Sequence, residues 1–529
     1  MNADQARPWP LTAEAVAAAV VGAVFSLSCV VTEAWWLQLL CAGLLAWRAA
    51  GVGPARAAML GLAFGSGWLG AGTWWLFISL HRYGGLPAPL AGLAVAALAL
   101  ALAVYLAIAL ALFARLRCGN AWLDALLFAA LWLAAELARG TLLTGFPWAA
   151  TGYGQIDGPL AALAPWVGVY GIGFVTAAAA ALPALALRAG ARRAVLPALT
   201  AAALLAAATM ATRDFTVGTG QLGVTLVQTN VAQDEKFAPE RLPQALAWLE
   251  VALGDARGPL VIAPETAIPL LPDQLGPEAW LRFGDLFRGD RAALIGIPLG
   301  SFETGYTNSV AGLSAQSTSL PGGFYRYDKQ HLVPFGEFIP TGFRWFVDMM
   351  RIPLGDFARG VKVPASFAFA GQRIAPNVCY EDLFGEELAL RFADEPLAPT
   401  LLANVSNIGW FGDTIAIAQH LHISRMRTLE LQRPMLRATN TGATAVIDHR
   451  GNVTASLAPF ARGMLDSVVE GRRGLTPFSR WVSRLGLAPA WLLAALPVLL
   501  AVAARVRRRR NSVQAKAEVL ANENKSHYH

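Results

Sequence analysis

Three side chains that can support acyl transfer follow apolar runs of this sequence. Glu265 closes the run VIAPE, Cys379 closes IAPNVC, and Lys329 lies in YRYDKQHLVPFGE. A carboxylate beside a thiol can accept its proton, and a lysine can stabilise the oxyanion that forms when a thiolate attacks a carbonyl. Together the three residues provide acyl-transfer chemistry without a histidine. Taken singly, each acid or base is better explained as a solvated charge at a strand end.

Cys379 is the one cysteine of its region. The chain has 4 cysteines, and the other three, Cys29, Cys41 and Cys118, lie in or beside long apolar segments. An unpaired cysteine is either a small buried hydrophobic residue or a nucleophile. The cysteine taken alone leaves both interpretations open.

The elements around these residues predict an α/β or layered α+β domain between residues 221 and 475, because short β-rich runs alternate with helical spacing. The predicted strands are 222–231, 259–266, 292–299, 373–382, 400–407 and 443–451, and the predicted helices are 239–256 and 417–439. The sequence contains no G-x-G-x-x-G, Walker, G-x-S-x-G or H-E-x-x-H motif. His420 and His422 are two positions apart, which does not suit one face of a helix, and we predict no metal site.

The rest of the chain has the composition of a membrane protein. In the whole chain 55% of the residues are hydrophobic and 15% are charged, whereas an average soluble domain has about 25% charged residues. A membrane-spanning helix needs about 20 apolar residues. The segments that meet this requirement are 13–31, 34–50, 57–80, 87–114, 121–138, 160–187, 194–211 and 486–504. We therefore predict an all-α bundle of eight transmembrane helices and one water-soluble domain.

The arginines in the short loops predict the orientation of the bundle. They gather between the second and third, the fourth and fifth, and the sixth and seventh predicted helices, and after the eighth. All these loops fall on one side, so we expect both termini in the cytoplasm and residues 212–485 on the outer face. Much of the net charge of +7 lies in Arg505 and residues 507–510, which we interpret as a topology anchor rather than a nucleic-acid site.

These patterns divide the chain into four parts. We expect transmembrane helices one to seven in 1–212, a periplasmic catalytic domain in 213–480, the eighth helix in 481–506 and a basic cytoplasmic tail in 507–529. The periplasm is oxidising, and proteins there usually pair their cysteines or omit them. An unpaired Cys379 is therefore unusual in such a domain.

Several stretches resemble known families. The order PET, YDKQHLVPFGE and CYE is similar to the nitrilase (carbon–nitrogen hydrolase) superfamily, which uses a Glu–Lys–Cys triad and a second glutamate. The stretches WLFISLHRYGG, ELARGTLLTGFPW, TGYGQ and NTGATAVID resemble the apolipoprotein N-acyltransferase family of the bacterial lipoprotein pathway. The resemblance covers roughly residues 10–505. It implies eight membrane helices, with a nitrilase-like αββα domain between the seventh and the eighth.

The resemblance implies a role for each matched residue. Glu265 is expected to be the general base, Lys329 the oxyanion and orientation residue, and Cys379 the nucleophile. Glu337 is expected to be the supporting carboxylate. The residues expected to bind substrate here are Tyr380, Glu381, Phe237 and Trp410. Phe237 departs from the family, which often has Trp after the Lys, so a role that needs an indole N–H is not available at this position.

The implied reaction has two steps and uses no cofactor. Cys379 takes the sn-1 acyl chain of a phospholipid such as phosphatidylethanolamine and forms a thioester. The free α-amine of the diacylglyceryl-cysteine at an apolipoprotein N-terminus then attacks the thioester, and a triacylated lipoprotein results. The expected partners are the phospholipid donor, the apolipoprotein acceptor and membrane lipid, without nucleic acid, and we expect a monomer.

The segment 341–360 is unusually apolar for a connection in a soluble domain. Its large apolar side chains are Phe343, Trp345, Phe346, Met349 and Met350. Such residues either pack on the core of the domain or form an interfacial lid that contacts lipid. On the second interpretation, Trp345 and Phe346 are also expected to bind substrate.

Two other functions fit part of the sequence. A membrane-tethered nitrilase-type amidase would use the same three residues on a small amide, with water as the acceptor, but it leaves the motifs of the membrane half unexplained. A transporter with a large outer domain would need ionisable residues inside several helices. Glu136 and Asp124 alone are obvious candidates in the sequence, and Glu136 opens the stretch ELARG, which suits a structural or headgroup role better than transport.

Overall fold

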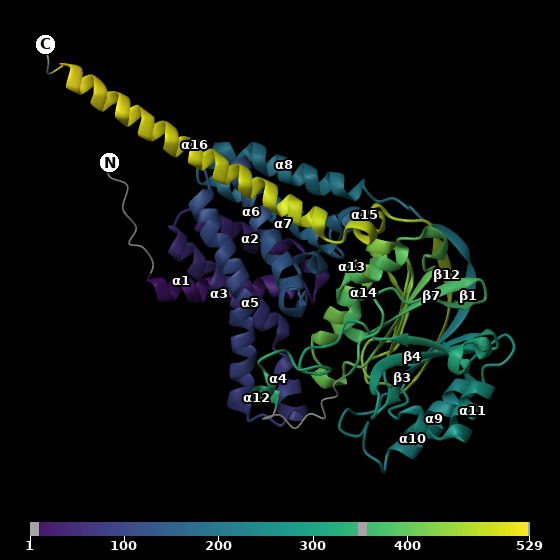
Figure 1. Cartoon of the computed structure of the whole chain (residues 1–529). Coiled ribbons are helices and arrows are strands. Elements are labelled where there is room, and N and C mark those ends of the chain that lie inside the picture. The colour runs from purple at the N-terminus through teal and green to yellow at the C-terminus, as the bar shows by residue number, and fades with distance from the viewer. Residues whose placement is uncertain (1–9, 348–356, 527–529) are drawn as a thin grey trace.

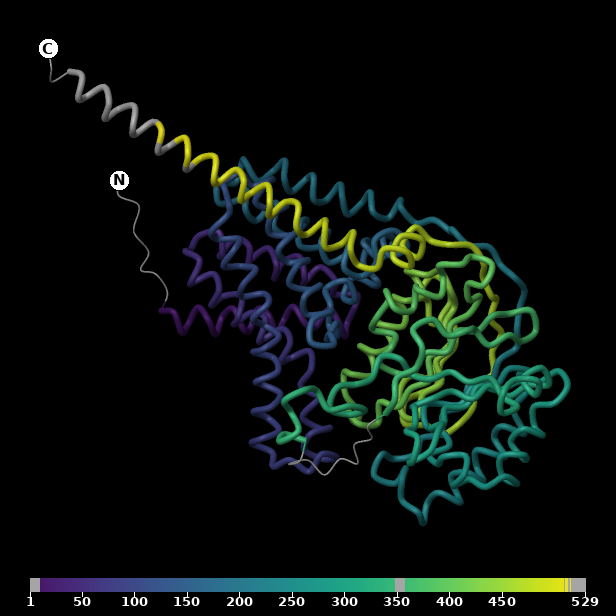
Figure 2. The backbone as a smooth tube through the Cα atoms, in the orientation of Figure 1, coloured from purple at the N-terminus to yellow at the C-terminus, as the bar shows by residue number. Residues whose placement is uncertain are grey.

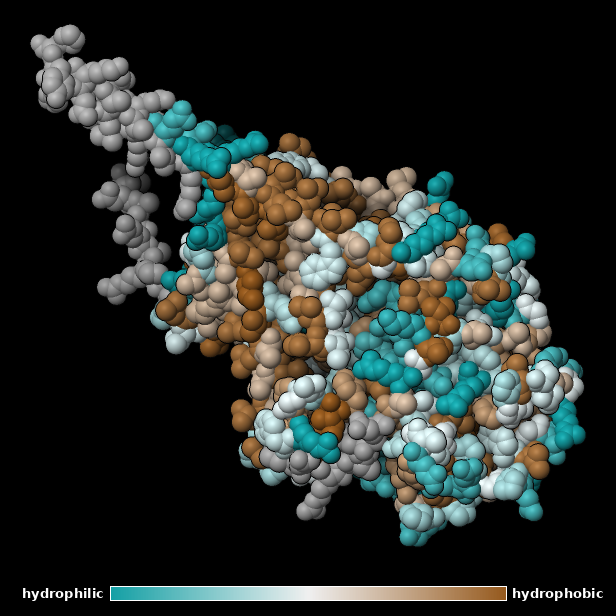
Figure 3. Space-filling view, in the orientation of Figure 1, coloured by the Kyte–Doolittle hydropathy of each residue, from teal (hydrophilic) through white to brown (hydrophobic). Residues whose placement is uncertain are grey.

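The computed structural model describes residues 10–347 and 357–526, which form a helical bundle and an α/β domain (Figure 1). The backbone trace shows helix α16 (Ala488–Ser526) starting beside the α/β domain, with its first half running along the bundle (Figure 2). In the space-filling view, hydrophobic residues gather over the bundle helices and hydrophilic residues over the α/β domain (Figure 3). The surface therefore changes character where the chain passes from one part to the other.

The bundle contains eight main helices within the described residues. They are α1 (Leu11–Leu27), α2 (Trp36–Ala49), α3 (Pro54–Thr73), α5 (Ala88–Leu116), α6 (Ala121–Thr141), α7 (Ala164–Leu187), α8 (Ala191–Thr209) and α16. By length and composition, 5 helical stretches of the described chain can cross a membrane, namely 88–116, 121–144, 159–187, 191–209 and 488–508. Helices α1 and α2 have 17 and 14 residues, fewer than the about 20 that a span needs. The predicted count of eight spans is therefore not confirmed.

Glycines on α3 allow its neighbours to approach closely. A Cβ atom on Gly61 would lie 2.7 Å from the carbonyl oxygen of Leu106 in α5. A Cβ atom on Gly67 would lie 1.9 Å from the carbonyl oxygen of Ala19 in α1. Membrane helices associate through such backbone contacts, because lipid tails give little hydrophobic driving force between helices.

The α/β domain contains two 6-stranded sheets. The first has the order β12 (Gly463–Arg473), β1 (Val217–Gln228), β2 (Leu260–Ile262), β3 (Ala292–Ser301), β4 (Gly305–Ser314) and β5 (Tyr325–Asp328). The second has the order β11 (Val453–Ser456), β10 (Ala445–Ile447), β9 (Met435–Thr439), β8 (Leu401–Ser406), β7 (Gln372–Val378) and β6 (Phe367–Phe369). Strands β1, β2 and β3 are parallel neighbours, and so are β7, β8 and β9.

The two sheets share one apolar core, and helices cover their outer faces. Between the sheets, Leu226 and Ile262 of the first belong to the same buried cluster as Val378 and Val405 of the second. Helices α9 (Leu242–Asp255) and α11 (Pro277–Asp285) pack on the first sheet. Helices α13 (Gly385–Ala389), α14 (Ala416–Leu431) and α15 (Pro477–Leu485) pack on the second. The domain is thus the αββα sandwich that the family resemblance implies.

One predicted helix is wrong after Leu431. The segment 417–439 contains α14, which ends at Leu431, and then strand β9, which begins at Met435. Gln432 has a left-handed backbone with φ 46, and Pro434 has no N–H for a helical hydrogen bond. The helix therefore stops, and the remaining apolar residues join the sheet.

Helix α14 fixes the α/β domain to the bundle. It packs against α7, and the Glu430 carboxylate accepts a hydrogen bond from the backbone N–H of Val169 at 2.7 Å. The Gln419 side-chain oxygen accepts hydrogen bonds from the indole N–H groups of Trp75 and Trp148 at 3.1 and 2.9 Å. These contacts join an element of the second sheet's outer face to the membrane helices.

Candidate active site

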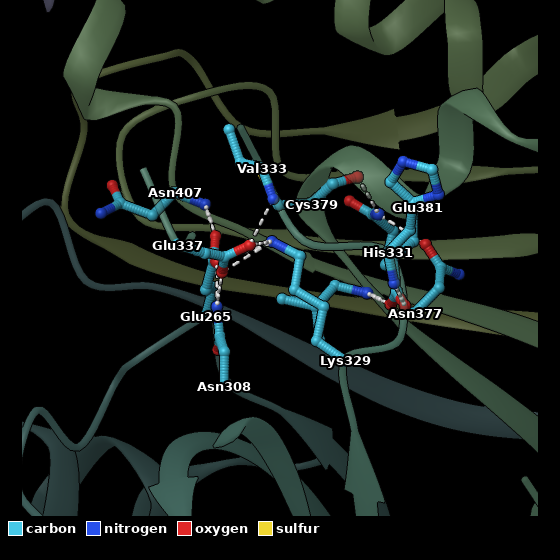
Figure 4. Close-up of polar contacts among 12 residues, drawn as sticks. Glu265, Asn308, Lys329, His331, Val333, Glu337, Asn377, Cys379, Glu381 and Asn407 are labelled. Carbon is cyan, nitrogen blue, oxygen red and sulfur yellow. Dashed lines mark hydrogen bonds and ion pairs between the residues drawn. The ribbon is translucent and has the colours of Figure 1, made fainter. Parts of the chain in front are cut away.

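The residues Glu265, Lys329 and Cys379 meet at the ends of three strands. Glu265 follows β2, Lys329 directly follows β5, and Cys379 directly follows β7. Figure 4 shows the ammonium of Lys329 pointing at the neighbouring carboxylates of Glu265 and Glu337. The sandwich therefore brings together residues from both of its sheets, as α/β folds commonly do at strand ends.

Two carboxylates hold the ammonium of Lys329. Its Nζ lies 2.9 Å from Glu337 Oε2 and 3.7 Å from Glu265 Oε1. The side chain of Lys329 is 1% exposed. Burial alone lowers the pKa of this lysine, but the carboxylates of Glu337 and Glu265 outweigh burial and raise it above its ordinary value. Lys329 is therefore a permanently charged donor at the site.

Two further residues fix the direction of the Glu265 carboxylate. The side-chain amide of Asn308, in β4, donates to Glu265 Oε1 and to Glu337 Oε1, both at 2.7 Å. The backbone N–H of Asn407, after β8, donates to Glu265 Oε2 at 2.8 Å. Glu337 is also held by the backbone N–H of Val333 at 2.8 Å. Each carboxylate of the pair thus has defined partners.

Cys379 is partly accessible and lies in a strained turn. Its φ of 51 is left-handed, and the 3-10 turn Cys379–Leu383 begins there. Its carbonyl oxygen accepts from the Asn404 amide at 3.2 Å and lies 3.3 Å from His420 Nε2. Burial, and then the Glu265 carboxylate, raise the pKa of the Cys379 thiol, while Lys329 and the Asn407 backbone N–H oppose the rise. The thiol is thus protonated at neutral pH and needs a base before it can attack.

Glu381, an expected substrate-binding residue, is occupied by protein donors. Its carboxylate accepts from the Tyr327 hydroxyl at 2.6 Å and from the backbone N–H groups of Val378, Gln330 and His331 at 2.6, 2.7 and 3.2 Å. It thereby joins the loop after β5 to the turn at Cys379. A direct contact of Glu381 with substrate stays a prediction.

Two other expected substrate-binding residues lie where the bundle meets the domain. Tyr380 is buried, and its hydroxyl donates to the carbonyl oxygen of Gly145 at 3.1 Å. The ring of Trp410 contacts that of Tyr83, with the centroids 5.6 Å apart. Tyr83 ends the π-helix that continues from α3 and the short helix α4 (Leu76–Ile78). Both residues therefore lie beside the bundle, next to the elements that carry Glu265 and Cys379.

The remaining expected substrate-binding residues are more exposed. Phe237 is 49% and Trp345 is 62% exposed. Phe346 packs against Phe335, with ring centroids 5.7 Å apart. Trp345 and Phe346 belong to the short helix α12 (Arg344–Val347). Residues 348–356 of the apolar segment, with Met349 and Met350, lie outside the described residues, so the interfacial lid stays a prediction.

Three site residues were missed from the sequence: Asn308, Asn407 and Lys236. Lys236 precedes Phe237, is 5% exposed, and donates from Nζ to the carbonyl oxygen of Glu265 at 2.9 Å. A polar residue inside the strand GYTNSV was the available signal for Asn308. Asn407 holds Glu265 through its backbone N–H. Every residue except proline has this group, so the residue type gave no signal.

Parts of the chain match two families. Residues 21–182 match the family described as Apolipoprotein N-acyltransferase N-terminal domain, and residues 227–470 match Carbon-nitrogen hydrolase. The first match covers bundle helices from α1 into α7. The second match extends from the end of β1 into β12 and includes Glu265, Lys329 and Cys379.

Curated relatives are similar along most of the chain. Apolipoprotein N-acyltransferase of Verminephrobacter eiseniae is 52% identical over 487 residues, which are 86% of this chain and 89% of that protein. Apolipoprotein N-acyltransferase of Ralstonia nicotianae is 47% identical over 501 residues, 93% of each chain. Apolipoprotein N-acyltransferase of Bordetella bronchiseptica is 43% identical over 498 residues, which are 85% of this chain and 89% of that protein.

Proposed function

This chain belongs to the apolipoprotein N-acyltransferase family, and on that premise we propose that it acylates the amino terminus of a lipoprotein through a thioester on Cys379. The protein is an acyltransferase of lipoprotein biosynthesis and is integral to the inner membrane. The acyl donor, the covalent intermediate and the roles of the site residues are the proposed part.

The observation that carries this proposal is the placement of the thiol. Cys379 lies in a left-handed turn at a strand end, and both Glu265 and Lys329 act electrostatically on its thiol. Lys329 itself contacts the Glu265 carboxylate at 3.7 Å. A nucleophile, a proton acceptor and a fixed positive charge are the parts that covalent acyl transfer needs.

In the first step, Glu265 takes the proton of the Cys379 thiol, and Sγ attacks the carbonyl carbon of a phospholipid ester. Lys329 stabilises the oxyanion of the tetrahedral intermediate. The bond to the glycerol oxygen then breaks, and Glu265 returns its proton to that oxygen. The products are an acyl thioester on Cys379 and a lysophospholipid.

In the second step, the uncharged α-amine of the diacylglyceryl-cysteine attacks the thioester carbonyl. Glu265 accepts a proton from the amine nitrogen, the bond from carbon to Sγ breaks, and the proton passes to Sγ. An amide forms and the free thiol is restored. A thiolate is both a good nucleophile and a good leaving group, which suits a residue that must act in both directions.

The test is an intact-mass measurement after incubation with phosphatidylethanolamine in detergent micelles. The wild type should gain the mass of one acyl chain, neutral hydroxylamine should remove it, and Cys379→Ala should gain none. Glu265→Gln and Lys329→Met should form the adduct at least about a hundredfold more slowly. An adduct on Cys379→Ala, or near-normal rates in both other variants, would contradict the mechanism.

The acceptor is tested in the same preparation. Adding a diacylglyceryl peptide with a free α-amine to the isolated acyl-enzyme should release the acyl chain as an amide on the peptide. A matched peptide with an acetylated α-amine is the control and should leave the thioester in place. Release of a free fatty acid with both peptides would indicate a hydrolase, the amidase-like alternative.

A further inference from the structure

Lys236 is a second buried lysine beside the reacting groups. It lies in the loop between β1 and α9, is 5% exposed, and donates from Nζ to the backbone carbonyl of Glu265 at 2.9 Å. Its neighbours along the chain point outward, since Asp234, Glu235 and Phe237 are all exposed. The loop therefore turns one charged side chain inward, toward the residue that must accept the thiol proton.

The loop that carries Lys236 is tied to the same wall of the site. The side-chain oxygen of Gln233 accepts from the Asn407 amide at 2.7 Å. The Asn440 amide donates to the carbonyl oxygen of Val231 at 2.8 Å. Since the backbone N–H of Asn407 also holds Glu265 Oε2, one residue positions both the loop and the carboxylate.

The ion pairs around Glu265 contain two carboxylates and one ammonium. Lys329 lies closer to Glu337, at 2.9 Å, than to Glu265, at 3.7 Å. Two carboxylates thus share one ammonium, and Asn308 bridges them without adding charge. Two buried carboxylates that share one ammonium are stabilised by any further positive charge nearby.

Lys236 also interacts electrostatically with these groups. Burial lowers the pKa of Lys236 to about 8, while the charges of Glu265 and of an ionised Cys379 act in the opposite direction. The lysine therefore remains mostly an ammonium at pH 7 and loses its charge just above. The groups that face Glu265 are Lys236, Lys329, Cys379 and, through Asn308, Glu337.

We propose that Lys236 is a positioning residue of the acyl transfer, whose ammonium holds the backbone of Glu265 and places a second positive charge beside the carboxylate that accepts the Cys379 proton. This inference rests on the proposed function, because it concerns the proton that Cys379 must lose. Lys236 does not touch the reacting carbonyl in this account, and it acts through Glu265.

The experiment measures the rate of the acyl adduct on Cys379 from pH 5.5 to 9.5, with phosphatidylethanolamine in micelles. In Lys236→Met, the acid limb should move upward by about one pH unit, because a positive charge beside the proton-accepting carboxylate is lost. The maximum rate should also fall at least about tenfold. Lys362→Met removes an exposed lysine and should match the wild type.

The variant Lys236→Arg distinguishes an effect of the charge at position 236 from an effect of side-chain packing there. The wild-type rate should decline above about pH 8, where Lys236 loses its proton. Arginine stays charged at that pH, so Lys236→Arg should keep the wild-type acid limb and lose the decline near pH 8. The thermal unfolding of each variant is recorded beside the rates.

Each outcome supports or overturns the positioning role proposed for Lys236. A uniformly slower Lys236→Met with an unmoved acid limb would overturn it, since loss of packing lowers the rate without changing the pH dependence. If Lys236→Met does not fold, an unchanged decline near pH 8 in Lys236→Arg would overturn it instead. Absence of an adduct in the wild type at every pH would overturn the proposed function itself, and the role of Lys236 with it.

Discussion

Cys379 must lose its thiol proton before it can attack, although its surroundings raise the pKa of the thiol. Burial and the Glu265 carboxylate raise the pKa of the thiol, and the left-handed backbone at φ 51 costs about 1–3 kcal/mol in a residue other than glycine. The donors on its carbonyl oxygen, Asn404 and His420, hold that conformation. Strain of this kind, beside a carboxylate and a lysine, is typical of a nucleophile rather than of a packed core cysteine.

Asn308 supports both carboxylates without changing their charge. Its amide lies 2.7 Å from Glu265 Oε1 and 2.7 Å from Glu337 Oε1. A carboxylate in the same place would repel both, whereas an apolar side chain would leave Glu265 with fewer donors. The position therefore requires a neutral donor.

Replacing Asn308 tests this requirement. Asn308→Leu should slow acylation of Cys379 by about tenfold to a hundredfold, because Glu265 loses a positioning bond. Asn308→Asp keeps the shape and adds a negative charge beside both carboxylates, so it should move the acid limb of the rate to higher pH. Rates of adduct formation across pH measure both effects. Equal pH dependence in the two variants would contradict the electrostatic part.

At the scale of elements, a buried polar network joins the turn at Cys379 to α14 and β9. Asp382 Oδ1 lies 3.0 Å from His420 Nε2, and Asp382 Oδ2 lies 3.4 Å from Arg437 Nη1. The Ser424 hydroxyl also donates to Asp382. Arg437 Nη2 lies 3.2 Å from His420 Nδ1 and can only donate, so Nδ1 accepts and the Nε2–H of His420 donates to Asp382.

Breaking this network should destabilise the fold. Asp382→Asn leaves the buried guanidinium of Arg437 without its counter-charge, which costs about 3–5 kcal/mol. Thermal unfolding in detergent should show a lower midpoint, and Asp382→Asn combined with Arg437→Met should recover part of the loss. Asp285→Asn breaks an exposed pair with Arg288 and should change stability by less than about 1 kcal/mol. Fully additive effects in the double variant would contradict the coupling.

At the scale of the whole molecule, the bundle and the α/β domain have different surfaces (Figure 3). Arg115 lies in the last turn of α5, and Arg117 and the exposed Cys118 lie in the loop between α5 and α6. The distribution of arginine predicts that this loop faces the cytoplasm and the α/β domain the periplasm. The proposed lipid substrates then lie in the outer leaflet, on the side of Cys379.

Labelling with a membrane-impermeant maleimide tests this orientation. Ser319→Cys places a thiol at an exposed position of the α/β domain, after β4, and intact cells should label it. Cys118 is the internal control and should be labelled only after the membrane is made permeable. Ser314, although nearby in sequence, is buried and does not suit this test. Labelling of Cys118 alone in intact cells would place the domain in the cytoplasm.

Much of this architecture follows from the sequence, because it depends on local composition. Scarce charge marks the bundle helices, and apolar runs ended by charged residues mark strand ends. Glu265, Lys329 and Cys379 each stand at such an end, and the structure brings them together. The same reasoning failed where two signals conflicted, since helical spacing continues past Gln432 while Pro434 ends the helix. The predicted count of eight membrane spans stays unconfirmed, since 5 helical stretches of the described chain are long and apolar enough to cross a membrane.

The tertiary structure alone decided how the site residues are held. Glu265 takes donors from Asn308 and Asn407, which are 43 and 142 positions away along the chain. Such contacts are set by the order of strands in the two sheets, and no local pattern encodes them. Lys236 and Phe237 are adjacent, yet one is buried and the other exposed, because a loop has no fixed periodicity to say which side chain turns inward. The sequence determined which groups are present at the site, and loop closure and sheet order decided which of them touch.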